Sequence, residues 1–291
     1  ATLQYIKDKV RMSTIIGTFQ STLKSFKYLS REWGRNCEDE RLLRGSLTGI
    51  MDCAITNGTK GNIKKTLNEL REVAVETNKE YAEKLGINRA AAITCVKPSG
   101  TVSQLVDSAS GIHARHNPYY VRTVRADNKD PLCKMMKEEG FPNEPDISKP
   151  DHTTVFDFPA KRPKWATCRN DMTAWKQLSL WHTYAKEWCE HKPSVTVSVK
   201  EEEWVNTAAW VYENFDDISG ISFLPFSDHS YRQAPYQDCS EEEYKELLKK
   251  MPKNVNWGTL AEYETKDYTS ASQVFACTSA GGCEIVDISP S

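Results

Sequence analysis

The sequence has no run of about eighteen apolar residues, the length that a membrane-spanning helix needs. Its first residues, ATLQYIKDKVRM, also lack the apolar stretch of a secretion signal. Positive charge is not in excess either, because 38 lysines and arginines face 40 aspartates and glutamates. A protein without surplus positive potential has no general means of holding a polyanion. We therefore expect a cytoplasmic protein with no membrane partner and no direct nucleic-acid partner.

Metal-binding spacings are absent as well. No Cys-x-x-Cys pair occurs and the histidines form no HExxH or HxxxH arrangement, so the sequence does not predict a structural zinc site. The odd number of cysteines shows none of the compact frameworks of secreted domains, and we expect most of them to be buried thiols. They are Cys37, Cys53, Cys95, Cys133, Cys168, Cys189, Cys239, Cys277 and Cys283.

The apolar residues that are present, 39% of the chain, are enough for a substantial core. Their spacing of three to four residues predicts a first helix around Ile15 to Phe26, which Gly34 would stop. The same spacing predicts another helix, the third along the chain, from Ile63 to Leu85, which Gly86 would end. Between them, acidic residues in a first turn favour a helix from Glu38 to Met51. These helices are predicted to be amphipathic and to pack on a larger core.

After Gly86 the pattern changes to short strands that alternate with helices, which is typical of an α/β fold with largely parallel strands. No low-complexity linker interrupts it, and residues 252–291 are polar and thinly patterned, so we expect an irregular or mobile tail there. The predicted strands are Ala92–Val96, Tyr119–Arg125, Val155–Phe158, Val195–Val199 and Ile221–Phe226, and the predicted helices are Pro131–Glu139, Thr173–Glu190, Glu201–Phe215 and Ser240–Met251.

The strongest local motif is the run KPSGT, which follows a predicted strand and precedes a segment that could open a helix. Such a turn presents unpaired backbone N–H groups to one point, where an anion fits. Ser99 and Thr101 add hydroxyl groups, and Gly100 lets a phosphate approach the backbone. An ordinary capped turn would use the same residues, and the string alone does not decide between the two.

A second candidate is the cysteine pair Cys277 and Cys283 in the closing stretch ACTSAGGCEI. Two cysteines that flank a Gly-containing bend on a mobile tail can form and open a disulfide without disturbing a core. Two unpaired thiols or half of a metal site are the alternatives. A buried structural disulfide is disfavoured in a reducing cytoplasm.

Two further runs are rich in polar and aromatic residues. His113 and His116 lie in SGIHARHNPYY, and Tyr231 to Gln237 form the run YRQAPYQ. From physical chemistry alone, histidines with satisfied hydrogen bonds and a packed turn with stacked tyrosines are the favoured interpretations.

Taken together and in order, these segments resemble one family. The run KPSGTVSQLVDSASGIHARHNPYYVRTVR from Lys97 to Arg125 is similar to the middle of the adenosylcobalamin-dependent (class II) ribonucleotide reductases. So are ERLLRGSLTGIMD from Glu40 to Asp52, QAPYQ from Gln233 to Gln237 and the closing CTSAGGCEI. The similarity spans nearly the whole chain.

The resemblance implies a ten-stranded α/β barrel, of which this chain would hold the second half in residues 1–251, with N-terminal helices and an irregular tail in residues 252–291. It implies that the substrate's phosphates bind Pro98, Ser99, Gly100 and Thr101. It also implies that Cys277 and Cys283 accept electrons from thioredoxin and pass them to an active-site pair. The two tail cysteines lie one residue further apart than the family's usual spacing.

The activity that the resemblance implies is radical reduction of ribonucleoside di- or triphosphates to deoxyribonucleotides. In the family, adenosylcobalamin generates a cysteine thiyl radical that takes the 3′ hydrogen, and a neighbouring asparagine and glutamate handle protons. The family places these groups in an Asn-Pro-x-x-Glu type loop, which this sequence does not contain. We therefore expect a chain that is inactive alone and that needs the N-terminal half of the enzyme as a partner, in keeping with its non-Met start.

Two other functions stay open at this point. The chain could be a nonenzymatic nucleotide- or phosphate-binding module, which would not need tail cysteines that thioredoxin reduces. It could instead be part of an oxygen-dependent reductase, whose central motif and tail match less well. The anaerobic type is disfavoured because no RVxGY-like glycyl-radical loop is found.

Overall fold

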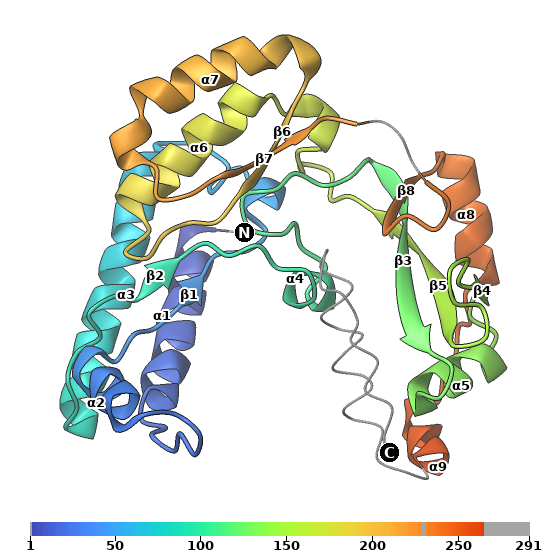
Figure 1. Cartoon of the computed structure of the whole chain (residues 1–291), viewed down its shortest axis with the longest axis horizontal. Helices are drawn as coiled ribbons and strands as arrows, with labels where there is room; N and C mark the ends of the chain where they lie inside the picture. Colours follow the sequence, from blue (N-terminus) through green and yellow to red (C-terminus); the bar gives the residue numbers. More distant parts are fainter. Residues whose placement is uncertain (1, 228–230, 265–291) are drawn as a thin grey trace. The chain divides into compact units, whose positions relative to one another are not determined.

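The computed structural model describes residues 2–227 and 231–264, which form two compact units (Figure 1). Unit 1 contains residues up to 115 together with 163–227, and unit 2 contains 116–162 together with the described residues from 231 onward. Within these described ranges no helix is both long and apolar enough to cross a bilayer.

Unit 1 is mainly helical, with two short parallel strand pairs, β1–β2 and β6–β7 (Figure 1). Its longer helices pack around these pairs. Its helices and strands are α1 (Leu3–Gln20), α2 (Arg31–Glu40), β1 (Gly45–Ser46), η1 (Ile50–Asp52), α3 (Ile63–Leu85), β2 (Thr94–Cys95), α4 (Val102–Leu105), η2 (Arg169–Asp171), α6 (Ala174–Glu187), β6 (Thr196–Val199), η3 (Glu201–Glu203), α7 (Trp204–Glu213), η4 (Phe215–Asp217) and β7 (Ser222–Pro225).

The core of unit 1 lies between α3, α6 and the parallel strands. Leu67 and Leu70 of α3 and Trp181 and Tyr184 of α6 are fully buried there. The polar atoms of these aromatic rings are satisfied, because the Trp181 indole donates to the Pro193 carbonyl and the Tyr184 hydroxyl donates to the Thr56 carbonyl. A buried ring that keeps its hydrogen bond contributes its full apolar surface to the core.

The third predicted helix is confirmed as α3. The Asn62 side chain accepts from the Lys65 amide at its start, and Gly86 ends it in the left-handed conformation. The helix predicted from Glu38 to Met51 is wrong, because Leu43 and Gly45 instead donate to Ala92 and Ile93 and lead into the β1–β2 pair.

Gly34 does not stop the first helix. Helix α1 ends at Gln20, and Gly34 lies inside α2, whose start is capped by Ser30 and whose end is left-handed Arg41. The Arg41 guanidinium donates to the Ser21 carbonyl and so ties the two helix ends together. The start and the end of α2 are therefore set by its capping residues, which the spacing of apolar residues does not reveal.

The side of α1 that faces α3 is also not the predicted one. Ile16, Phe19 and Leu23 are exposed, whereas Thr14 and Thr18 are buried. Each threonine hydroxyl donates to the carbonyl four residues earlier, and the Asn78 amide of α3 donates to Thr18 Oγ1. Polar groups that are hydrogen-bonded to one another can be buried at little cost.

Unit 2 is built on an antiparallel sheet of order β4-β5-β3-β8 (Figure 1). A small core of Cys133, Met136, Phe141 and Phe156 packs on it. Its helices and strands are β3 (Tyr119–Asp127), α5 (Pro131–Glu138), β4 (Asn143–Pro145), β5 (Thr153–Lys161), β8 (Tyr236–Asp238), α8 (Glu241–Lys250), η5 (Trp257–Thr259) and α9 (Leu260–Tyr263).

The expected parallel arrangement is therefore wrong for unit 2 and correct only for the two short pairs of unit 1. Strand β5 pairs with β3 in the opposite direction, with Tyr119 opposite Lys161 and Asp127 opposite Thr153. The fold is mixed α/β, and the half-barrel stays a prediction.

Residues 252–264 pack on unit 2. The Trp257 ring lies 6.0 Å from that of Phe141, and the Tyr263 hydroxyl donates to Glu138 at 2.5 Å. The predicted helix before them is confirmed as α8, with the capping box of Ser240 and Glu243. Cys277 and Cys283 lie outside the described residues, and the domain boundary at residue 252 stays a prediction.

We predict that Tyr184→Phe lowers the free energy of unfolding by about 1 kcal/mol, because the buried Thr56 carbonyl loses its donor. Urea denaturation followed by tryptophan fluorescence measures this change. Tyr212→Phe is the matched control, since Tyr212 is 86% exposed and should leave stability unchanged. Equal midpoints for the two variants would contradict the prediction.

Candidate phosphate-binding site

The KPSGT run forms a turn between β2 and α4 in unit 1 (Figure 1). Cys95 and Val96 before it are buried, whereas Lys97, Pro98, Gly100 and Thr101 are exposed and Ser99 is half-buried. The predicted substrate-binding residues therefore lie together at the surface on a buried base. A ligand can reach this turn from solvent.

The backbone N–H groups of the turn differ in availability. The Ser99 amide donates to Ser110 Oγ at 2.7 Å, and Pro98 has no N–H. The amides of Gly100, Thr101 and Val102 have no hydrogen-bond acceptor within residues 2–227 and 231–264. Three adjacent donors are thus free for an anion.

Two details differ from the sequence-based picture of this turn. Ser99 Oγ accepts from the Ser103 amide at 2.9 Å, so this hydroxyl also caps α4. Helix α4 has only four residues, and its dipole is correspondingly small. The free amides, rather than the dipole, make this turn suitable for a phosphate.

A second segment, residues 110–111, packs against the backbone of the turn. Gly111 has a φ of 48°, and a Cβ at this position would lie 2.7 Å from the Lys97 carbonyl oxygen. The neighbouring Ser110 accepts from Ser99, so residues 110–111 contact both ends of the Lys97–Ser99 backbone. At Gly100, by contrast, a Cβ would meet no atom within 4 Å, and the space above the turn is open.

Behind this segment lies a buried arginine to which sequence reasoning gave no role. The Arg115 side chain is only 4% exposed. It donates to both carboxylate oxygens of Asp52, at 3.0 and 2.8 Å, and to the Asp107 carboxylate at 2.9 Å. Asp52 also accepts from the Ala109 amide at 2.7 Å. The chain between α4 and Ser110 is therefore fixed by charge-assisted hydrogen bonds.

His113 is half-buried and links two segments rather than acting as an acid-base group. Its Nδ1 lies 3.0 Å from the Ser110 carbonyl, and its Nε2 accepts from the Thr196 amide at 3.1 Å. Both ring nitrogens are engaged, and burial lowers the pKa of His113. The neutral ring links the Ser110 segment to β6, which confirms the interpretation as a satisfied histidine.

His116 and the QAPYQ run belong to unit 2. The His116 ring stacks on Tyr236 at 5.6 Å, and its Nε2 lies 2.6 Å from an Asp238 carboxylate oxygen. Gln233 is 2% exposed; its amide donates to Glu144 and Pro145, and it accepts from the Ile147 amide. The packed turn is confirmed around Gln233, but the stacking of its tyrosines is not: Tyr236 stacks on His116, and Tyr231 is 64% exposed.

Burial makes some of the described cysteine thiols less acidic. All of the described cysteines are free thiols, and burial raises the pKa of Cys95 and of Cys189. A thiol with a raised pKa carries little of the nucleophilic thiolate at neutral pH. Among residues 2–227 and 231–264, no cluster of His, Cys, Asp and Glu side chains could hold a metal ion.

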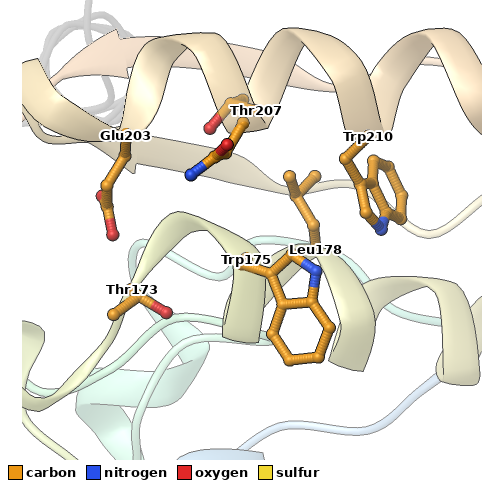
Figure 2. Close-up of a pocket in the computed structure, with 7 residues that line it drawn as sticks. Thr173, Trp175, Leu178, Glu203, Thr207 and Trp210 are labelled. Atoms are coloured by element: carbon orange, nitrogen blue, oxygen red, sulfur yellow. The ribbon is translucent and has the colours of Figure 1, made fainter.

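A hollow of about 240 Å³ lies between α6 and α7 (Figure 2). Its one carboxylate, Glu203, accepts from the amides of Ala174 and Lys200 and is used to cap α6 and η3. No basic side chain lines it, so it is not an anion site. The lining residues are Thr173, Trp175, Leu178, Glu203, Asn206, Thr207 and Trp210.

The fold of the chain matches that of part of a class II ribonucleotide reductase. The crystal structure of a B12-dependent (class II) ribonucleotide reductase superimposes with a TM-score of 0.70. The match covers 82% of this chain and 37% of that one at 22% sequence identity.

Sequence comparison points to the same family. The chain is 29% identical over 215 residues to the adenosylcobalamin-dependent ribonucleoside-triphosphate reductase of Euglena gracilis, and 30% identical over 199 residues to that of Lactobacillus gasseri. These matches cover 72% and 66% of this chain. The predicted resemblance to adenosylcobalamin-dependent reductases is confirmed.

The chain spans 29% and 26% of the length of these two relatives. A probable enzyme of the same kind from Dictyostelium discoideum is 32% identical over 190 residues, which are 63% of this chain and 24% of the relative. No family model matches the sequence.

We predict that Gly111→Ala destabilises unit 1 by about 2 kcal/mol or more, because it combines a left-handed backbone with a contact to the Lys97 carbonyl. Thermal or urea denaturation measures the loss. Gly100→Ala is the matched control and should fold as the wild type does, since its Cβ meets open space. Similar losses at both glycines would show that the described turn is wrong.

We also predict that His113 makes stability depend on pH. Its pKa is lowered in the folded state, so below the usual value near 6.5 the unfolded chain binds more protons. The contribution of His113 to stability is fully present above the pKa of the unfolded chain. It is lost as the pH falls toward the lowered pKa of the folded state, by at most ~1.4 kcal/mol per pH unit for one proton.

Urea denaturation between pH 7.5 and 5 measures this dependence. His113→Gln should flatten the pH profile of the unfolding free energy relative to the wild type. His152→Gln, which removes an exposed histidine, should not flatten it. Parallel profiles for wild type and His113→Gln would refute the assignment.

Proposed function

We propose that this chain is part of an adenosylcobalamin-dependent ribonucleotide reductase and that its KPSGT turn binds the substrate's phosphates. The observation that carries this proposal is the set of free amides of Gly100, Thr101 and Val102 at an exposed turn on a buried base. A phosphate accepts several such bonds at once. In this role Pro98 and Ser99 shape the turn, while Gly100 and Thr101 contact the phosphate.

The substrate is a ribonucleoside triphosphate under this proposal, since the similar enzymes from Euglena gracilis and Lactobacillus gasseri are triphosphate reductases. Three phosphates carry more negative charge than the turn alone can balance. Lys97, the first residue of the run, is exposed and could add a positive charge. Sequence reasoning did not assign a role to this residue.

The hollow between α6 and α7 is too small for a cobalamin. The hollow between α6 and α7 encloses about 240 Å³, which is below the range of ~300 to 1,000 Å³ usual for pockets that hold small ligands. The cofactor is larger than such ligands. No described residue is therefore assigned to adenosylcobalamin, and the reaction is proposed to require the remainder of a reductase, including its N-terminal half.

Electrons enter, in this proposal, through Cys277 and Cys283. Reduction of one ribonucleotide releases water and consumes two electrons and two protons, which an active-site dithiol supplies as it becomes a disulfide. The tail dithiol reduces that disulfide by thiol exchange and is itself oxidised. Reduced thioredoxin then restores the tail dithiol and leaves as its own disulfide.

Binding of cytidine triphosphate to the chain tests the phosphate role of the turn. In ¹H–¹⁵N spectra we expect the amide signals of Gly100, Thr101 and Val102 to shift with cytidine triphosphate and not with cytidine. Gly100→Val places a branched side chain in the open space above the turn and should weaken binding about tenfold, because a hydrogen bond to a charged group is worth ~1.5 to 3 kcal/mol.

Gly34→Val is the matched control. Gly34 is also a glycine whose Cβ would meet no atom within 4 Å, but it lies in α2. This variant should bind cytidine triphosphate as the wild type does. Shifts confined to other parts of unit 1, or equal binding by both variants, would count against the proposal.

A further inference from the structure

Asp107 ends the turn after α4 in a left-handed backbone conformation, which Asp adopts more readily than most residues but less readily than Gly. Its φ is 46°, in the left-handed region that residues with a Cβ adopt rarely. Packing does not hold it there, because the Asp107 side chain is 82% exposed. Another interaction must therefore offset the unfavourable backbone conformation.

The buried Arg115 provides that interaction at two points. One guanidinium nitrogen donates to the Asp107 carboxylate at 2.9 Å, and the other donates to the Asp107 carbonyl at 2.7 Å. The second bond fixes the backbone itself. Arg115 in turn is oriented by the two-point contact with Asp52, whose side chain is 13% exposed.

A short series of hydrogen bonds connects the backbone at Asp107 to the phosphate turn. The next residues include Ala109, whose amide donates to Asp52 and whose carbonyl accepts from Gly49. Ser110 then accepts from the Ser99 amide. A shift at Asp107 would move Ser110 and thereby the direction of the neighbouring Gly100 and Thr101 amides.

We propose that Arg115 is a positioning residue for the phosphate turn: it holds Asp107 in the left-handed conformation and so sets the direction of the amides that receive the substrate's phosphates. This inference rests on the proposed function. The role requires a planar group with several donors in fixed directions, which lysine does not provide.

Three variants test the inference, with tripolyphosphate as the probe. Asp107→Ala removes the carboxylate and keeps the strained backbone, and it should raise the Kd about tenfold, which corresponds to ~1.4 kcal/mol. Asp107→Gly removes the same carboxylate but adopts positive φ freely, so its Kd should lie close to the wild-type value. Arg115→Lys should bind at least as weakly as Asp107→Ala.

The spectroscopic readout separates positioning from general loss of stability. Hydrogen exchange of the Ser99 amide, measured without ligand, should accelerate in Asp107→Ala and return toward the wild-type rate in Asp107→Gly. Asp216→Ala, at an exposed aspartate of η4 in the same unit, is the control for removing a negative charge and should change neither the Kd nor the exchange rate.

Each outcome has a distinct meaning. If the wild type does not bind tripolyphosphate, the proposed function fails and this inference fails with it. If the wild type binds and the two Asp107 variants weaken binding equally, the carboxylate rather than the backbone conformation of Asp107 matters, and the positioning inference alone is overturned. If Arg115→Lys does not fold, the two Asp107 variants still decide, because their side chain is exposed.

Discussion

The candidate site depends on the hydrogen bonds that the Arg115 guanidinium makes. This guanidinium is nearly inaccessible to solvent and yet bonds two carboxylates and one carbonyl. Removing such a cation from water costs several kcal/mol, which its partners offset only when nearly every donor is satisfied. Replacing a buried ion pair with apolar residues is often neutral or stabilising, so stability alone does not explain its presence. What apolar residues cannot supply is direction: a planar fork fixes the backbone between α4 and Ser110 in one arrangement.

Much of the local structure could be predicted from the sequence, because the relevant signals are themselves local. The alternating valines of β6 and the Ser240 and Glu243 capping box of α8 each act within a few residues, and both predictions are confirmed. The predictions fail where partners that are distant in sequence determine the local structure. Helix α1 buries Thr14 and Thr18 because Asn78, sixty residues further on, supplies a donor. The segment after α2 is extended because residues 92–95 pair with it. Periodicity carries no information about either partner.

Part of the candidate site could likewise be predicted from the sequence, and part could not. The KPSGT turn is visible in the sequence because strand, proline, glycine and helix start follow one another directly. Its support is not visible: Asp52 and Arg115 are 63 residues apart, and nothing in either neighbourhood marks them as partners. Gly111 gives a weak signal, since a glycine beside a polar run indicates a turn but not the nearby Lys97 carbonyl. For His113 the interpretation from physical chemistry alone, a histidine with satisfied hydrogen bonds, is correct, because both of its ring nitrogens are engaged.

These features determine which tasks the described residues can perform. A radical reduction of ribose needs a thiol that gives up a hydrogen atom, groups that move protons and a source of electrons. The His113 ring is neutral with both nitrogens engaged, so it is not available to move a proton. The KPSGT turn, in contrast, has free donors, an open approach and a fixed backbone. Phosphate binding at a distance from the reacting ribose contributes through orientation, because holding a substrate in a reactive geometry supplies entropy that the chemical step would otherwise need. In the proposed reductase, unit 1 therefore anchors and orients the nucleotide.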